Sequence, residues 1–229
     1  MTADQPTDTA RLKEAAAQAR VALERARAGR ASQSLVLVAA SPPAAAALLD
    51  QIDVETRALG LLTLRADAGA GASLPALLAR QLRDTLQPLA LTPSAQGLAA
   101  QADSALVGFA RGLRDRYPDI PLLEGTAEPG LADNGALEFD LVALMESVGR
   151  AAKAGDAMLA LLIDRLDRLD APQLGALIAA LHRCAQASLP VLLIGAGGPS
   201  LRAQMASAKS YAERMFAFPY LGPTEREAH

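Results

Sequence analysis

Charged side chains cluster directly after the most apolar run of the chain, residues 158–163. They are Asp164, Arg165, Asp167, Arg168 and Asp170. Carboxylate oxygens bind divalent cations, so a metal site is one interpretation of three aspartates at intervals of three. The two interleaved guanidinium groups repel a cation and can pair with the aspartates instead. The pattern therefore favours a solvated, ion-paired connection between a strand and a helix.

Other groups that could do chemistry are few. His182 and Cys184 lie close together on a predicted helix, but there is no second cysteine, and the only other histidine is His229. Neither metal binding nor a Cys–His nucleophile is expected from so few groups. Glycines at 69 and 71, and at 195, 197 and 198, superficially suggest phosphate-binding loops. Neither set completes G-x-G-x-x-G, so we expect no dinucleotide site.

Composition indicates which elements must position these groups. Hydrophobic residues make up 51 % of the 229-residue chain, whereas aromatic residues make up 3 % and Trp is absent. A core of Ala, Leu, Val and Ile favours helices lying on an aliphatic sheet over an aromatic-rich β-sandwich. Short apolar runs without polar alternation predict strands that are buried on both faces. We expect these strands over residues 35–39, 61–64, 158–163, 191–194 and 215–218.

Helical spacing and capping residues predict helices between the strands. They are expected over 9–29, 42–59, 74–87, 95–116, 172–188 and 200–209, with another from 137 onward and an irregular segment over 118–134. This alternation predicts an α/β fold, a three-layer αβα sandwich with a five-stranded parallel sheet. Runs 35–39 and 158–163 are apolar throughout, so we expect them among the inner strands.

Five blocks, in order along the chain, resemble bacterial AAA+ ATPases related to origin-recognition proteins. They are Ser73-Leu-Pro-Ala-Leu-Leu-Ala-Arg80, Leu159-Ala-Leu-Leu-Ile-Asp164, Leu174-Gly-Ala-Leu-Ile-Ala-Ala-Leu-His182, Leu189-Pro-Val-Leu-Leu-Ile-Gly-Ala-Gly197 and Ser210-Tyr-Ala-Glu-Arg-Met-Phe-Ala-Phe-Pro219. The resemblance covers about residues 12–223. It implies a P-loop NTPase core with strand order 5-1-4-3-2, and ATP and Mg²⁺ as cofactors. Asp164 stands where the family places an acid that helps to hold Mg²⁺.

The chain departs from this family where the phosphates should bind. A P-loop, G-x-x-x-x-G-K-[ST], uses glycines and main-chain N–H groups to cradle phosphates and a lysine to neutralise them. The corresponding positions here are Ser41, Pro42, Pro43, Ala44, Ala45 and Ala46. They include neither glycine nor lysine, and proline has no N–H to donate. We therefore expect no nucleotide-binding residue in this segment.

The hydrolytic residues are also replaced. The glutamate that activates water in the resembling family is Arg165 here, and a guanidinium stays protonated at neutral pH. Gly195 to Gly198 provide no polar side chain to sense a γ-phosphate. We expect a disordered leader over 1–8, an AAA+-like core over 9–223 and the start of an absent or truncated lid over 224–229. The expected fold thus has no helical lid.

These features predict a degenerate AAA+ ATPase-like domain, a pseudo-ATPase that acts in protein–protein contact or regulation. The alternative is an ATP-binding or ATP-hydrolysing family member with a non-standard phosphate site. We expect no catalytic residue and no cofactor, and a protein partner or an oligomer with Arg214 and Arg165 at the interface. The resembling family carries an arginine near a subunit boundary at Arg214, and pairing of Arg214 with Glu213 or another acid is the simpler interpretation.

Net charge and the absence of sorting signals indicate the expected partners and cellular location. The net charge of −3 creates no global positive field for nucleic acid or anionic lipid. The polar N-terminus is not typical of a signal peptide, and no apolar run is long enough to span a membrane. A single cysteine suits a reducing compartment. We therefore expect a cytoplasmic protein.

Overall fold

The computed structural model describes residues 8–30 and 32–222. The expected leader lies almost wholly outside these residues, as does the expected lid start, and helix α1 begins at Asp8. The helices are α1 (Asp8–Arg27), α2 (Pro42–Ala58), α3 (Leu74–Ala90), α4 (Gln96–Leu113), α5 (Leu137–Ala154), α6 (Ala171–Gln186), α7 (Leu201–Ala208) and α8 (Ala212–Met215). Two 3-10 helices, η1 (Ala68–Ala70) and η2 (Leu166–Arg168), follow strands. The strands are β1 (Ser34–Ala39), β2 (Leu62–Asp67), β3 (Leu159–Asp164), β4 (Val191–Gly197), β5 (Phe216–Ala217) and β6 (Tyr220–Leu221).

The sheet has the order β2-β3-β4-β1-β5, and every pairing is parallel. This order is equivalent to 5-1-4-3-2, so the predicted α/β architecture is confirmed. β1 lies between β4 and β5, and β3 lies between β2 and β4. The two runs expected among the inner strands are therefore in inner strands, and all six residues of β1 and of β3 are buried.

The predicted bounds of the strands at both edges of the sheet were wrong. The edge strand β2 continues beyond Leu64 through Arg65 to Asp67, because these residues pair with the end of β3. The Arg65 guanidinium also pairs with Asp50 of α2 at 2.9 Å. At the other edge, residues predicted as one strand form the end of α8 and two-residue β5. A further short strand, β6, pairs with β1. Pro219 separates β5 from β6, and its carbonyl accepts the Val38 N–H at 2.9 Å.

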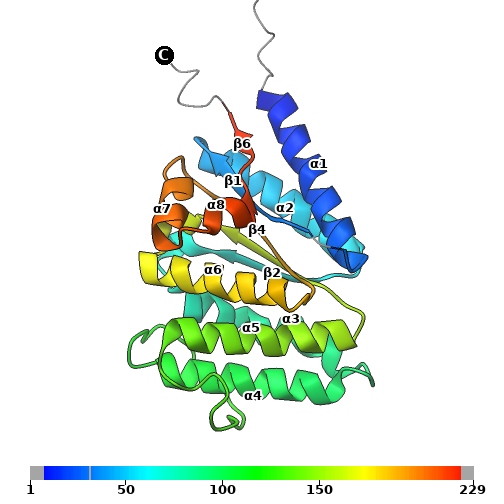
Figure 1. Cartoon of the computed structure of the whole chain (residues 1–229), viewed down its shortest axis with the longest axis vertical. Helices are drawn as coiled ribbons and strands as arrows, with labels where there is room; N and C mark the ends of the chain where they lie inside the picture. The colour runs from blue at the N-terminus through cyan, green and yellow to red at the C-terminus, as the bar shows by residue number, and fades with distance from the viewer. Residues whose placement is uncertain (1–7, 31, 223–229) are drawn as a thin grey trace, which may run out of the picture.

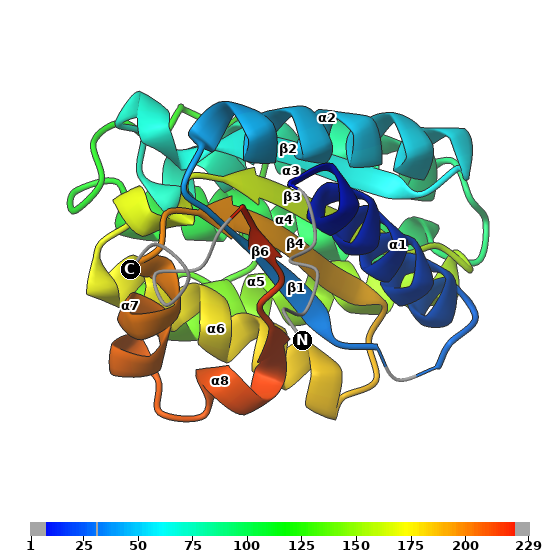
Figure 2. The same ribbon diagram turned by 90° about the horizontal axis from the view of Figure 1, so that it is seen from above.

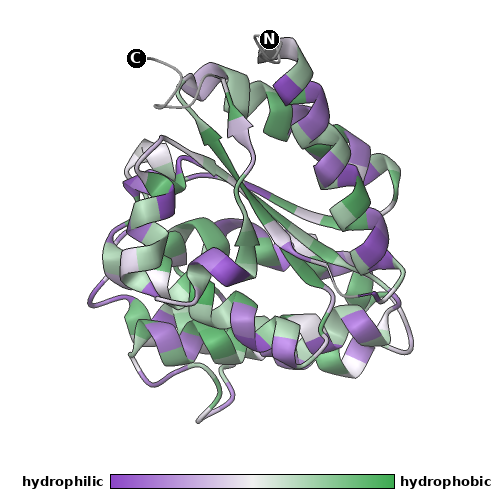
Figure 3. Ribbon diagram, turned by 45° about the horizontal axis from the view of Figure 1, so that its top comes forward, coloured by the Kyte–Doolittle hydropathy of each residue, from purple (hydrophilic) through white to green (hydrophobic). Residues whose placement is uncertain are grey.

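Alternating side chains of the strands form two hydrophobic cores, one on each face of the sheet. Leu35, Leu37 and Ile194 point into the core that α1 and α2 cover. Leu64, Leu161 and Ile163 point into the larger core on the other face. Figure 2 shows α1 and α2 on one side of the sheet and α6 on the other. Strands and buried helix faces are mostly hydrophobic in Figure 3, and hydrophilic segments lie on the outer helices.

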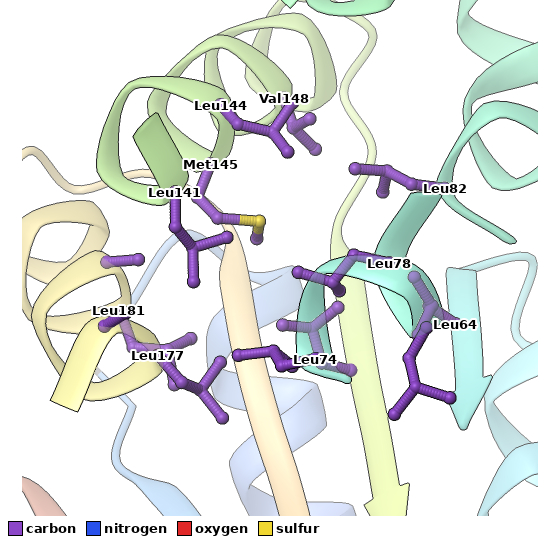
Figure 4. Close-up of a cluster of buried hydrophobic side chains, with 14 of the residues drawn as sticks. Leu64, Leu74, Leu78, Leu82, Leu141, Leu144, Met145, Val148, Leu177 and Leu181 are labelled. Carbon is purple, nitrogen blue, oxygen red and sulfur yellow. The ribbon is translucent and has the colours of Figure 1, made fainter. Parts of the chain in front are cut away.

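Helices that do not lie directly on the sheet, α4 and α5, also contribute to the larger core. Figure 1 shows α6, α5 and α4 one below another on this side. Leucines of α3, α5 and α6 meet in this core, together with Leu64 of β2 (Figure 4). The segment between α4 and α5 is irregular, as predicted. In the part of the chain that the structure describes, no helix is long and apolar enough to cross a membrane.

Candidate functional site

The connection from β1 to α2 occupies the place where a P-loop protein binds phosphates. β1 ends at Ala39 and α2 begins at Pro42, so only Ala40 and Ser41 lie between them. A P-loop wraps several residues around the phosphate groups before its helix begins. Two residues cannot form such a loop. The Ser41 side chain makes no capping hydrogen bond, and its backbone is extended, with φ −108°.

The N-terminus of α2 also lacks the donors that would bind an anion. Pro42 and Pro43 have no N–H group. The next N–H, from Ala44, donates to the Ser41 carbonyl at 3.2 Å, and the N–H of Ala45 donates to the same carbonyl at 3.4 Å. The anion affinity of a helix start comes from its unpaired N–H groups. The residues present do not fit the phosphates of ATP at this position.

Asp164 ends β3 and is the acid that the family resemblance relates to Mg²⁺. Its side chain is only 5 % exposed, and its Oδ1 accepts the N–H of Arg165 at 2.7 Å. Burial raises the pKa of Asp164 above its ordinary value, because removal from water disfavours the charged carboxylate. Arg165 itself adopts a left-handed backbone, φ 52°. A buried carboxylate beside a cation is poorly suited to bind Mg²⁺.

The Arg165 side chain lies across the turn that follows β2. Its Nε donates to Asp67 Oδ1 at 2.7 Å, and its Nη2 bonds the other oxygen, Oδ2. The Asp67 Oδ1 also accepts the N–H of Gly69 at 2.8 Å. These bonds hold the pKa of Asp67 below its ordinary value, chiefly through the hydrogen bond from Arg165. We call Asp67, Gly69 and Arg165 the clamp.

Gly69 is the residue that makes room for this clamp. A Cβ at Gly69 would lie 2.0 Å from Arg165 Nε and 2.1 Å from its Cζ. Only glycine allows the guanidinium to lie against the backbone there. The sequence indicated that Arg165 can pair with a carboxylate, and in the structure it does, although the partner is not one of the interleaved aspartates. The partner, Asp67, is 98 residues away along the chain.

The turn η2 fills the space between the ends of β3 and β4. Its Leu166 side chain is buried against Gly195, where an added Cβ would lie 2.2 Å from Leu166 Cδ1. The Asp167 Oδ1 accepts the N–H of Gly198 at 3.1 Å. The glycine-rich end of β4 therefore packs against η2.

The remaining acidic and nucleophilic candidates have structural contacts. Asp170 caps α6 by accepting the Gln173 N–H at 2.8 Å. The ring of His182 lies 4.8 Å from that of Tyr211. Cys184 is buried, and burial raises the pKa of its thiol to about 12. Among residues 8–30 and 32–222, no three His, Cys, Asp or Glu side chains gather as metal ligands do.

Arg214 does not pair with Glu213, so that interpretation is wrong. Glu213 instead accepts from Arg202 Nε at 2.9 Å, and Arg202 is also hydrogen-bonded to Tyr220. Arg214 lies on the exposed side of α8, and its side chain forms no ion pair with any residue that the structure describes. Its carbonyl accepts from Gln33 Nε2 at 3.3 Å. The guanidinium is therefore available to an external group.

A pocket of about 430 Å³ lies beside the clamp, at the carboxyl ends of β2 and β3, and sequence reasoning missed it. Ser73, Asp119 and Gln173 line it together with Arg165 and Arg168. Of the first three, Ser73 alone carried a sequence signal: it directly precedes the helix predicted from residue 74, and the structure shows that it caps α3. Asp119 lies in the irregular segment and Gln173 inside a helix, so no motif marks either residue.

Comparison with known proteins finds no matching family model, curated protein or solved structure. The fold and the site define the chain as a parallel α/β protein with strand order β2-β3-β4-β1-β5 and flanking helices. The phosphate-binding place of such a sheet is closed by a short, proline-containing connection.

Proposed function

We propose that this chain is a degenerate AAA+-like domain, a pseudo-ATPase that serves as a protein-interaction or regulatory module. The two-residue connection between β1 and α2 carries this proposal. It leaves neither the length nor the donors that a phosphate cradle needs. The five sequence blocks and the strand order support the relationship to AAA+ proteins, because both accord with a P-loop NTPase core.

The clamp supports the same proposal, because it provides no group that could activate water for hydrolysis. Arg165 stands in place of a general base, and its guanidinium is bonded to Asp67. A protonated guanidinium cannot accept a proton from water at neutral pH. A protein that no longer binds nucleotide can keep its fold for the surface it presents. Large apolar side chains that are more than half exposed belong to Val21, Val54, Leu91, Leu122 and Phe139.

The decisive test is calorimetric titration of the full chain with Mg-ATP and Mg-ADP, followed by a phosphate-release assay. We expect no binding heat and no turnover. Arg165→Glu alone restores neither, because the phosphate cradle is absent as well. Micromolar affinity, or turnover that Asp164→Asn abolishes, would support the alternative, an ATP-binding or ATP-hydrolysing protein with a non-standard phosphate site.

The exposed guanidinium of Arg214 supports one form of interaction. An arginine from one subunit can stabilise the charge that develops on a neighbour's γ-phosphate. We therefore propose that Arg214 acts on an active AAA+ partner. Turnover of a candidate partner is measured with the wild-type chain, with Arg214→Ala and with Arg150→Ala as an exposed control. Stimulation by the wild type and the control, but not by Arg214→Ala, is the expected result. Equal stimulation by all three excludes this role for that partner.

A further inference from the structure

The pocket beside the clamp is lined by a side-chain amide whose N–H group has no partner among the described protein groups. Gln173 is 8 % exposed, and its Oε1 accepts the Leu74 N–H at 2.6 Å. This bond fixes which end of the amide faces α3, so the Nε2 group is the end left for the pocket that Gln173 lines. Nε2 donates to no described protein group. This N–H group can therefore donate to an acceptor on a ligand bound in the pocket.

The pocket also presents one available cation. Arg168 is 70 % exposed, and its Nε lies 3.8 Å from the nearest carboxylate oxygen, on Asp167. That distance is too long for a hydrogen bond, so the guanidinium donors remain available. The other lining cation, Arg165, is already bonded to Asp67. Arg168 and the Gln173 amide together suit a carboxylate, which accepts several hydrogen bonds.

One carboxylate lines the same pocket. Asp119 accepts the Ser73 N–H at 2.7 Å and the Ser73 hydroxyl at 2.9 Å. Each of its oxygens has a second acceptor position. Its charge repels a simple anion, just as Arg168 repels a simple cation. A ligand that carries both charges satisfies both groups.

We propose that this pocket binds a small zwitterion, a free α-amino acid. Its carboxylate bonds Arg168 and Gln173 Nε2, and its ammonium group bonds Asp119. The pocket volume of about 430 Å³ is in the range of small-molecule sites. Its place, outside the carboxyl ends of parallel strands, is where open α/β sheets bind ligands. The site does not depend on the proposed pseudo-ATPase function, and nucleotide titration does not test it.

The test is a thermal-shift screen of the full chain against the twenty standard amino acids, with calorimetry on those that stabilise it. We expect one amino acid or a few related ones to bind. The amine that lacks the carboxylate and the acid that lacks the ammonium group should bind at least about tenfold more weakly, since each loses a charge-assisted contact. Binding of either analogue as tightly as the amino acid overturns the zwitterion assignment.

Two variants locate the site. Arg168→Ala should weaken binding about tenfold or more. Arg150→Ala is the matched control, because Arg150 is a partly exposed arginine of α5 whose nearest carboxylate also lies 3.8 Å away. Asp119→Asn should lower the affinity for the amino acid but not the affinity for the acid that lacks the ammonium group. No binding by any amino acid, or equal affinities of the Arg168 and Arg150 variants, overturns the proposal.

Discussion

Leu166 and Gly195 provide the sharpest test of how the ends of β3 and β4 are closed. A Cβ at Gly195 would lie 2.2 Å from Leu166 Cδ1 and 3.7 Å from the Ile163 carbonyl oxygen. Leu166 is fully buried, so its side chain cannot turn out into water. Gly195→Ala therefore overpacks this site, at a cost of about 1–3 kcal/mol in the free energy of unfolding. Leu166→Ala leaves a cavity instead and costs about 2–5 kcal/mol.

The two substitutions should compensate each other, because the alanine Cβ at 195 needs the space that Leu166 leaves. Urea denaturation of both single variants and the double variant measures this coupling. We expect the double variant to lose less than the two single losses combined, by at least about 0.5 kcal/mol. Gly97→Ala is the control: a Cβ there meets no atom within 4 Å, so this change should be neutral or stabilising. Additive losses would refute the reasoning.

Three further outcomes test the clamp, the buried Asp164 and the buried thiol of α6. Gly69→Ala should displace Arg165 from Asp67 and lower the urea midpoint, but not in an Arg165→Ala background. Asp164→Asn should be at least as stable as the wild type at neutral pH. Burial raises the pKa of Asp164, so its ionised form opposes folding, and the difference should vanish below the ordinary value of 3.8, where the wild type is protonated too. The thiol of Cys184, with its pKa raised to about 12, should resist alkylation at pH 8 in the folded protein and react in urea.

Sequence patterns predicted the sheet well because its inner strands need no polar face. β1 and β3 are buried on both sides, and this burial requires the unbroken apolar runs that were recognised. The edges were harder to predict. Arg65 belongs to β2 because its backbone pairs with β3 opposite Leu162, a tertiary contact with no local signal. Tyr220 and Leu221 form a strand too short to show any periodicity.

The candidate site also has features that the sequence predicts and features that it does not. The absence of a P-loop was visible in the sequence, because a P-loop is a contiguous motif that can be checked in one segment. The partner of Arg165 was not visible, because Asp67 and Arg165 meet only when β2 pairs with β3. The pocket was invisible for a related reason. Asp119 and Gln173 come from different parts of the chain, and hydrogen bonds to the N-terminus of α3 bring them together.

The polar groups that follow β2 and β3 are bonded to one another and to nearby backbone groups. Asp67 accepts from Arg165 and from the backbone of its own turn, and Asp167 accepts from the end of β4. Gly69 gives the guanidinium of Arg165 the space it occupies. Without these partners, the carboxylates would repel each other without compensation. Because these contacts support one another, substituting any one of these residues disturbs the others as well. Phosphate binding at this place would therefore require both a longer β1–α2 connection and release of the clamp in the same protein.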